Sequence, residues 1–186
     1  MISLHHNNAR LKMNTLYPSI IKCLEDIDNS LIKNKYLDKV TLKFHRTWLY
    51  RNITFEISAF CIENNIREEM EISYNNTTWV DDISKTFRQL KIEEMQQQKR
   101  NKDYKIPLAK IISRLSKQPN LDPALAHALK KMSRYIKTFR NPYAHGERSA
   151  STNNLTLIKT KDSFEDIKNI YEEFEKYIFN RNRSIT

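Results

Sequence analysis

The sequence contains a single glycine, Gly146, among its 186 residues. β-Sandwiches and barrels need turn glycines at short intervals, and a doubly wound nucleotide-binding fold needs a glycine-rich first loop. A phosphate-binding loop of the GxxxxGK type needs two glycines, so this motif is excluded. The shortage of glycine, together with only five prolines, therefore favours long helices joined by polar loops.

The chain has only two cysteines, Cys23 and Cys61, and both lie where apolar residues recur at helical spacing. No CxxC or Cys/His pattern with the spacing of a zinc site occurs. We therefore expect two reduced thiols in the core of a cytoplasmic protein. No apolar run is long enough to span a membrane, and the first residues lack the apolar core of a signal peptide. The sequence thus predicts a soluble, cytoplasmic protein with no membrane partner.

Acidic residues are scarce relative to basic ones: 22 Asp and Glu stand against 32 Lys and Arg, for a formal net charge of +10. A soluble protein this basic is often a polyanion binder. The alternative is that lysines only solvate helix faces in a chain rich in Asn, Lys and Ile. Charge alone therefore points to a nucleic-acid partner but identifies no site.

Apolar residues recur every three or four positions along most of the chain, which predicts an all-α fold. The expected helices cover residues 17–32, 38–70, 81–100, 107–116, 123–139 and 162–180. They predict an up-and-down helical bundle of about five to six helices, in one domain over residues 1–186 with residues 1–14 as a flexible arm.

Single residues mark several helix ends. Pro18 fits the first turn of the first helix, and Asp122 followed by Pro123 is a strong helix start. Residues 155–160 are expected to form a short extended segment, and the last helix is expected to start with a capping box at Ser163. In the long second helix, Val40, Phe44, Trp48, Leu49, Ile53, Ile57, Phe60 and Cys61 are expected to form a core-facing stripe.

Several catalytic patterns are absent from the sequence, namely HExxH, GxSxG and the EF-hand loop. Adjacent acids such as Glu93 and Glu94 point about 100° apart on a helix, so they do not converge on an ion. His45 and His127 lie inside expected helices, where lone histidines are usually structural or surface residues. We expect no metal and no cofactor.

The sequence FRNPYAHG, residues 139–146, holds the remaining candidates, because it places Arg140 five residues before His145. RNA carries its own nucleophile, the 2′-hydroxyl. Its cleavage needs proton transfer, which histidine performs near neutral pH, and positive charge on the phosphate, which arginine supplies. Asn141 could donate a hydrogen bond to a phosphate oxygen, and no step requires a metal.

The same residues also have a purely structural explanation. Arg140 near a helix C-terminus complements the helix dipole, Pro142 stops the helix, and Gly146 permits a turn with positive φ. An Arg–His spacing of this kind also arises by chance in a basic chain. A structural cap needs neither Asn141 nor His145, however, so the context of the motif carries the functional interpretation.

In an all-helical, basic chain, FRNPYAHG resembles the R-x4-6-H signature of HEPN domains, in which a polar residue, often Asn, follows the arginine. The resemblance implies a HEPN-like bundle over residues 15–180 and a metal-independent endoribonuclease that leaves a 2′,3′-cyclic phosphate and a 5′-hydroxyl. It implies that Arg140 contacts the phosphate, Asn141 supports it and His145 transfers protons. It also implies a homodimer in which two motifs face each other in one cleft.

Proteins of this family are common as toxins of toxin–antitoxin modules and as antiviral effectors, so the resemblance implies single-stranded RNA or tRNA as substrate and an antitoxin or regulatory protein as partner. In one branch, a tyrosine two residues after the histidine is modified by a nucleotidyltransferase. Glu147 occupies that position here, so this regulation is not expected. Tyr143 could stack on a base or pack at the helix end. Two alternatives remain: a catalytically inactive HEPN-like module that binds RNA, a nucleotide or a protein, and a helical adaptor or antitoxin for an acidic partner.

Overall fold

The computed structural model of the protein describes residues 3–140 and 156–180, and within these ranges every regular element is a helix. This confirms the predicted all-α class. The helices form six continuous segments. In chain order they are α1 (Ser3–Lys33), α2–η1–α3 (Lys39–Glu56, Ile57–Glu63 and Asn64–Asn75), α4 (Asp82–Gln98), α5 (Leu108–Leu115), α6–η2 (Pro123–Tyr135 and Ile136–Arg140) and α8–η4 (Leu157–Phe174 and Glu175–Phe179), where η1, η2 and η4 are π-helical.

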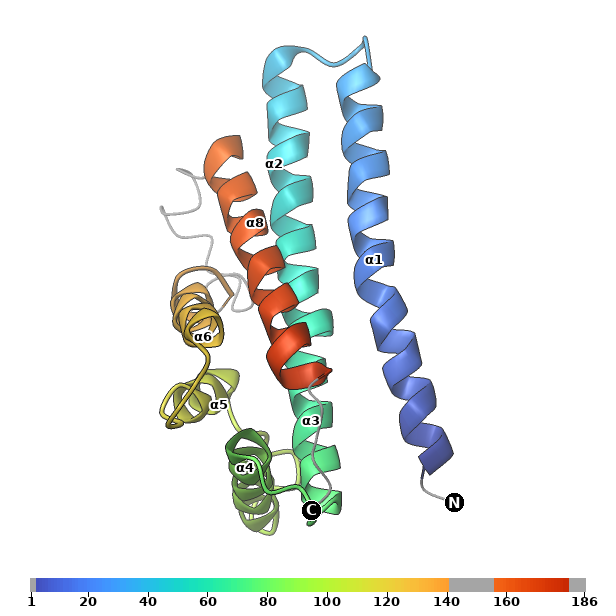
Figure 1. The fold of residues 1–186 in the computed structure, drawn as a ribbon. Helices are drawn as coiled ribbons and strands as arrows, with labels where there is room; N and C mark the ends of the chain where they lie inside the picture. Colours follow the sequence, from blue (N-terminus) through green and yellow to red (C-terminus); the bar gives the residue numbers. More distant parts are fainter. Residues whose placement is uncertain (1–2, 141–155, 181–186) are drawn as a thin grey trace.

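The α2–η1–α3 segment is a long rod on which the rest of the bundle is assembled. Figure 1 shows α1 beside its α2 half and α8 packed along it, whereas α4, α5 and α6 gather around its lower half. The principal helix contacts are α3 with α4, α2 with α8, α6 with α8, and α1 with α2. The arrangement is a helical bundle with one dominant axis.

Aspartate side chains begin three of the helices. Asp38 accepts hydrogen bonds from the backbone N–H groups of Val40 and Thr41, and Asp81 accepts one from Ser84. Asp122 accepts from the N–H of Ala124, with proline at the first helical position, as the sequence predicts. Each cap satisfies donors that have no partner inside their own helix.

Two predicted helix starts are wrong. Helix α1 begins at Ser3, so residues 3–14 belong to a helix and Pro18 lies in its interior, not in its first turn. Helix α8 begins at Leu157 and not near Ser163, because the Thr156 hydroxyl accepts from the Lys159 N–H and caps it there. Residues 157–160, expected to be extended, are therefore helical.

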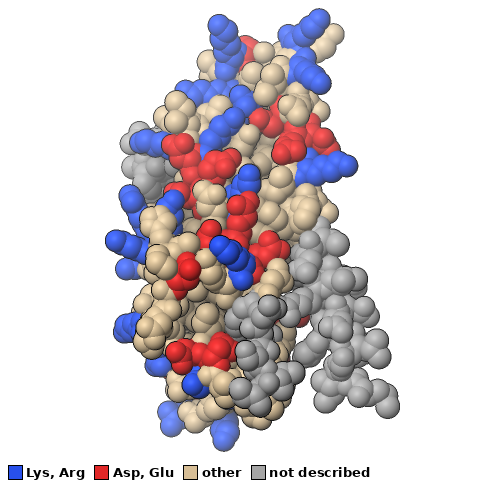
Figure 2. Space-filling model, viewed as in Figure 1, with Lys and Arg blue, Asp and Glu red and all other residues tan. Residues whose placement is uncertain are grey.

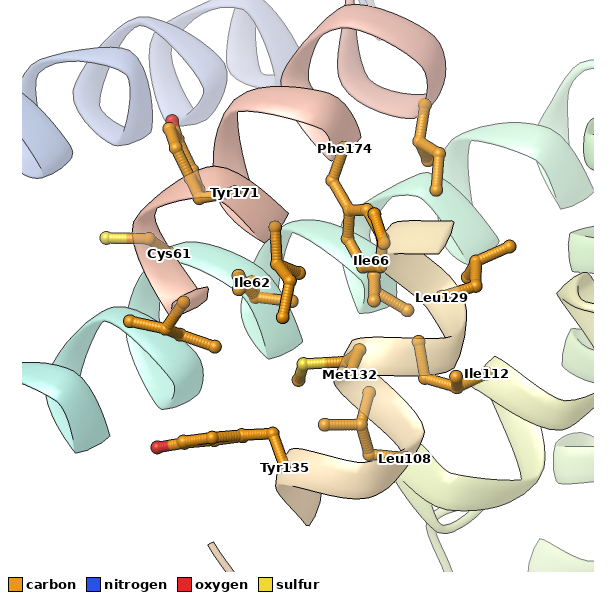
Figure 3. Close-up of a cluster of buried hydrophobic side chains, with 14 of the residues drawn as sticks. Cys61, Ile62, Ile66, Leu108, Ile112, Leu129, Met132, Tyr135, Tyr171 and Phe174 are labelled. Carbon is orange, nitrogen blue, oxygen red and sulfur yellow. The ribbon is translucent and has the colours of Figure 1, made fainter. Parts of the chain in front are cut away.

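The core lies where the middle of the rod meets α5, α6 and α8. Figure 3 shows side chains from these elements pointing toward one another, among them Ile62 and Ile66 of the rod, Met132 of α6 and Phe174 of α8. All four of these side chains are fully buried. Such interdigitation fixes how α6 lies against η1, and α6 leads directly into Arg140.

The predicted core-facing stripe and the two thiols are only partly confirmed. Val40, Phe44, Trp48 and Phe60 are exposed large hydrophobic residues, whereas Leu49, Ile57 and Cys61 are buried. Cys23 is also exposed, so only one of the two free cysteines is a core residue. Burial raises the pKa of the Cys61 thiol to about 12, which keeps it protonated and unreactive near neutral pH.

Helix α1 is tied to the bundle at two places. Asp28 accepts two hydrogen bonds from Arg46 of α2, at 2.6 and 2.9 Å, and a third from the hydroxyl of Tyr50 at 3.0 Å. Nearer the N-terminus of α1, the ring of Tyr17 is stacked on the ring of Tyr171 of α8, with centroids 3.9 Å apart.

Within the described residues, no helix is both long and apolar enough to cross a membrane.

We predict that Asp28→Asn destabilises the protein at pH 7 by about 2 kcal/mol, the scale of hydrogen bonds to a charged group. The hydrogen bond from Arg46 lowers the pKa of Asp28 below its ordinary value. The folded state therefore favours the carboxylate, and this stabilisation is complete above the unfolded pKa near 4 and is lost as the pH falls through the lower, folded pKa. Urea unfolding at several pH values between about 7 and 3 should show the wild type approaching the variant in stability.

Asp26→Asn is the matched control, because Asp26 is an exposed acid on the same helix. The Asp26→Asn variant should have nearly the same free energy of unfolding as the wild type at every pH. An Asp28→Asn deficit that stayed constant down to pH 3 would contradict a role for the charge of Asp28.

Candidate functional site

Arg140 is the one residue of the predicted site that the structure describes. It is the last residue of η2, the π-helical continuation of α6. Asn141, Tyr143 and His145 lie outside the described residues, as does the predicted helix stop at Pro142. Whether these side chains come together with Arg140 therefore stays a prediction.

The Arg140 guanidinium is held by a carboxylate from a distant part of the chain. Its Nη2 donates to Oε2 of Glu63, the last residue of η1, across 2.6 Å. Both side chains are largely buried, with 26% of Arg140 and 13% of Glu63 exposed. A short charge-assisted bond of this kind fixes the direction of a guanidinium far better than a solvated ion pair does.

Glu63 binds a second arginine through its other oxygen. Nη2 of Arg67 donates to Oε1 of Glu63 across 2.7 Å and also reaches the backbone carbonyl of Ile106 at 3.3 Å. Nη1 of Arg67 lies 3.8 Å from Oε2 of Glu94, which accepts from the Ile106 N–H. The carboxylate that holds Arg140 is thus itself fixed by α4 and by the chain before α5.

Packing brings the two helices of the site together close to this ion pair. The Tyr135 hydroxyl, at the end of α6, donates to the backbone carbonyl of Thr54 in α2 across 3.3 Å. Tyr135 and Thr54 are both buried. Arg140 meets Glu63 five residues after Tyr135 and nine residues after Thr54, so the hydrogen bond and the ion pair fasten the α6–η2 segment to the rod at two places.

Glu63 and Arg140 both end π-helical segments, and π-helical turns are frequent at functional sites. The same geometry recurs in η4, however, where Ile178 and Phe179 pack into the core. In this chain a π-helical turn therefore accompanies close packing as well as the candidate site, and by itself it does not mark a function.

Sequence reasoning missed Glu63. The one local signal is its position four residues before Arg67, which is the spacing of a helical ion pair. Nothing in the sequence connects Glu63 with Arg140, because that contact depends on how α6 packs against the rod.

The histidines that the structure describes with their side chains lie on the surface, as predicted. His45 of α2 and His127 of α6 are exposed, and the His45 ring makes an edge contact with Phe44. Within residues 3–140 and 156–180, no group of three or more His, Cys, Asp or Glu side chains is placed to hold a metal ion. In the described part of the chain, the candidate site thus consists of cations and carboxylates in ion pairs.

A partly exposed guanidinium in this setting has a clear chemical use. It carries five N–H donors in a rigid fork, and a fork of this kind fits the oxygens of a phosphate. Comparison of the chain with protein-family models, with curated proteins and with solved structures gave no match in any of the three.

Proposed function

We propose that this protein is a metal-independent endoribonuclease that cleaves single-stranded RNA or tRNA, and that it serves as a toxin of a toxin–antitoxin module or as an antiviral effector. The observation that carries the proposal is that Glu63 fixes the guanidinium of Arg140 directly before the segment that supplies Asn141 and His145. The net charge of +10 supports a polyanionic substrate.

The proposed reaction uses the nucleophile that RNA itself provides. A base removes the proton of the 2′-hydroxyl, the 2′-oxygen attacks the adjacent phosphorus, and the bond from phosphorus to the 5′-oxygen breaks. An acid protonates the leaving 5′-oxygen, so the products are a 2′,3′-cyclic phosphate and a 5′-hydroxyl. Arg140 stabilises the charge that develops on the phosphate, Asn141 supports it, and His145 transfers protons.

A homodimer follows from the same chemistry. One histidine cannot act as base and acid in a single step, whereas a two-fold dimer offers two copies of His145 from one sequence. In this proposal two motifs face a common cleft, and an antitoxin or regulatory protein controls access to it.

The Glu63 contact also favours a second candidate, a HEPN-like module without catalytic activity that binds RNA, a nucleotide or a protein partner. A carboxylate 2.6 Å from the guanidinium competes with a phosphate for the charge of Arg140. In a ribonuclease this carboxylate orients the arginine, whereas in a binding module it only weakens the interaction with anions.

The catalytic assignment is tested at His145. The His145→Ala variant should lose cleavage of end-labelled RNA and of tRNA by about 10²- to 10⁴-fold in EDTA, because a proton-transfer group is missing, while its circular dichroism stays that of the wild type. His127→Ala is the matched control, because it removes an exposed histidine of α6 and should cleave like the wild type. Equal cleavage by His145→Ala and the wild type would refute the catalytic assignment.

A substitution at Glu63 separates the two candidate functions. If the protein is a ribonuclease, Glu63→Gln should lower kcat at least tenfold with little change in KM, because Arg140 loses its fixed orientation. If it is a silent module, the same change should strengthen RNA binding, because a competing negative charge is removed.

Glu93→Gln is the control for Glu63→Gln. Glu93 of α4 pairs with Lys110 and Arg114 of α5, so the variant breaks an ion pair of the bundle that does not involve Arg140. Loss of activity in both variants, together with lower thermal stability in both, would assign Glu63 a structural role only.

A further inference from the structure

The hairpin of α1 and α2 reaches beyond the rest of the bundle. In Figure 1 the upper end of α2 and the turn that connects it to α1 extend past the start of α8. Here α2 has α1 on one side, where Arg46 pairs with Asp28 and Leu49 is buried. We call residues 31–48 the hairpin tip.

The other side of α2 at the tip carries three large apolar residues in a row. Val40, Phe44 and Trp48, which we call the α2 stripe, follow one another at four-residue spacing and are 79%, 65% and 61% exposed. Tyr36, in the turn before α2, is almost fully exposed. Apolar side chains gathered in this way on a protein surface usually mark a binding site.

The hairpin tip also carries four lysines. Lys33, Lys35, Lys39 and Lys43 are all exposed, and none of them forms an ion pair within residues 3–140 and 156–180. Lys39 and Lys43 stand four residues apart in a row beside the stripe, where like charges repel each other. The tip itself, residues 31–48, contains one acid, Asp38, whose carboxylate caps α2. Figure 2 shows blue side chains projecting from the tip.

We propose that the hairpin tip binds a single-stranded stretch of RNA, with bases stacked on Phe44 and Trp48 and phosphates against Lys39 and Lys43. Sites for single-stranded nucleic acid combine aromatic side chains that stack on bases with a row of positive charge that follows the backbone. The inference rests on the proposed function, because it makes the tip a docking site for the substrate of Arg140.

The charge of the tip argues for RNA over a second copy of the chain. Two-fold pairing through this face would bring two lysine-rich tips together, and each would repel the other. A strand of RNA is attracted to the tip instead, because its phosphates can pair with lysines that form no ion pair within the described residues. The occupant that fits both the aromatic stripe and its charge is therefore an RNA strand.

The rod connects the tip with the candidate site. Trp48 and Glu63 lie on one continuous helix, roughly 22 Å apart along its axis at about 1.5 Å per residue. At about 3.4 Å per stacked nucleotide, about six nucleotides span that distance. An RNA strand bound at the tip can thus reach Arg140 by running along the rod, which gives longer substrates an advantage over short ones.

Binding is tested with the full chain carrying His145→Ala, so that RNA stays intact, and with a fluorescein-labelled single-stranded 12-nucleotide RNA. Adding Phe44→Ala and Trp48→Ala should weaken binding at least tenfold in an anisotropy titration, because each lost stack is worth about a factor of ten. The matched control adds Ile92→Ala and Met95→Ala, which remove exposed apolar side chains of α4, and should bind with unchanged affinity.

Two further readouts are specific to the proposed contacts. The chain has two tryptophans, so in Trp79→Phe the fluorescence reports on Trp48 alone and should be quenched by the RNA. Lys39→Gln with Lys43→Gln should reduce the slope of log affinity against log salt by about 1.4, at about 0.7 per lost phosphate contact on a single strand. Lys99→Gln with Lys102→Gln removes the same charge elsewhere and should leave the slope unchanged.

Three results would overturn the docking site. The first is wild-type RNA affinity in the Phe44→Ala, Trp48→Ala variant. The second is a wild-type dimer that becomes monomeric in this variant at unchanged RNA affinity per chain, which would assign the stripe to a second copy. The third is that poly-glutamate quenches Trp48 and displaces the labelled RNA as effectively as unlabelled RNA does, which would assign the tip to an acidic protein.

Cleavage assays keep this inference separate from the proposed function. We call Phe44→Ala with Trp48→Ala the α2 variant. In a chain that keeps His145, this variant should lose more kcat/KM on the 12-nucleotide RNA than on a tetranucleotide. If the chain cleaves and this difference is absent, the docking site fails while the ribonuclease proposal stands. If the chain does not cleave but the α2 variant binds RNA more weakly, the ribonuclease proposal fails while the docking site stands.

Discussion

The continuity of the helix from Lys39 to Asn75 is the constraint on which the rest of the structure depends. Because α2, η1 and α3 form one rod, α1 and α8 pack against one half, and α4 packs against the other. The same rod presents Thr54 to Tyr135 and Glu63 to Arg140. A kink within η1 would separate these partners. The register of α6 along the rod, and therefore the position of Arg140, is set by the straightness of one helix and by the core around it.

The ion pair between Arg140 and Glu63 has two opposing consequences. It orients a guanidinium that would otherwise sample many rotamers, and orientation of this kind is a large part of what an active site supplies. It also lowers the positive potential that a phosphate would meet. Arg67 resolves part of this conflict, because it binds the other oxygen of Glu63 and shares the negative charge. Arg67 also lies 3.8 Å from Glu94, and Glu63 divides its negative charge between two arginines while it holds Arg140 in place.

The sequence predicted the helical class and most helix positions, because apolar spacing and capping residues such as Asp122 act locally. Local signals also explain the errors. Residues 3–14 carry no regular apolar stripe, yet they belong to α1. The start of α8 depends on a second local capping residue, Thr156, which competes with Ser163 in the sequence. The stripe of Val40, Phe44 and Trp48 has the spacing of a core face but lies beyond the helices that would cover it. The Glu63 contact joins residues 77 positions apart, and no periodicity encodes it.

The exposed α2 stripe lies on the same rod as Glu63, which pairs with Arg140. A folded chain stabilises itself by covering residues such as Phe44 and Trp48, and leaving them exposed forgoes that gain. Four lysines of the same tip, which form no ion pair within the described residues, raise its positive potential further. Neither the exposed stripe nor the cluster of lysines stabilises the single chain, so a ligand that binds at the hairpin tip explains both better. A strand of RNA, which carries flat bases and negative charge, would cover the stripe and neutralise the lysines at once, and the rod that displays both also carries Glu63, the carboxylate that orients Arg140.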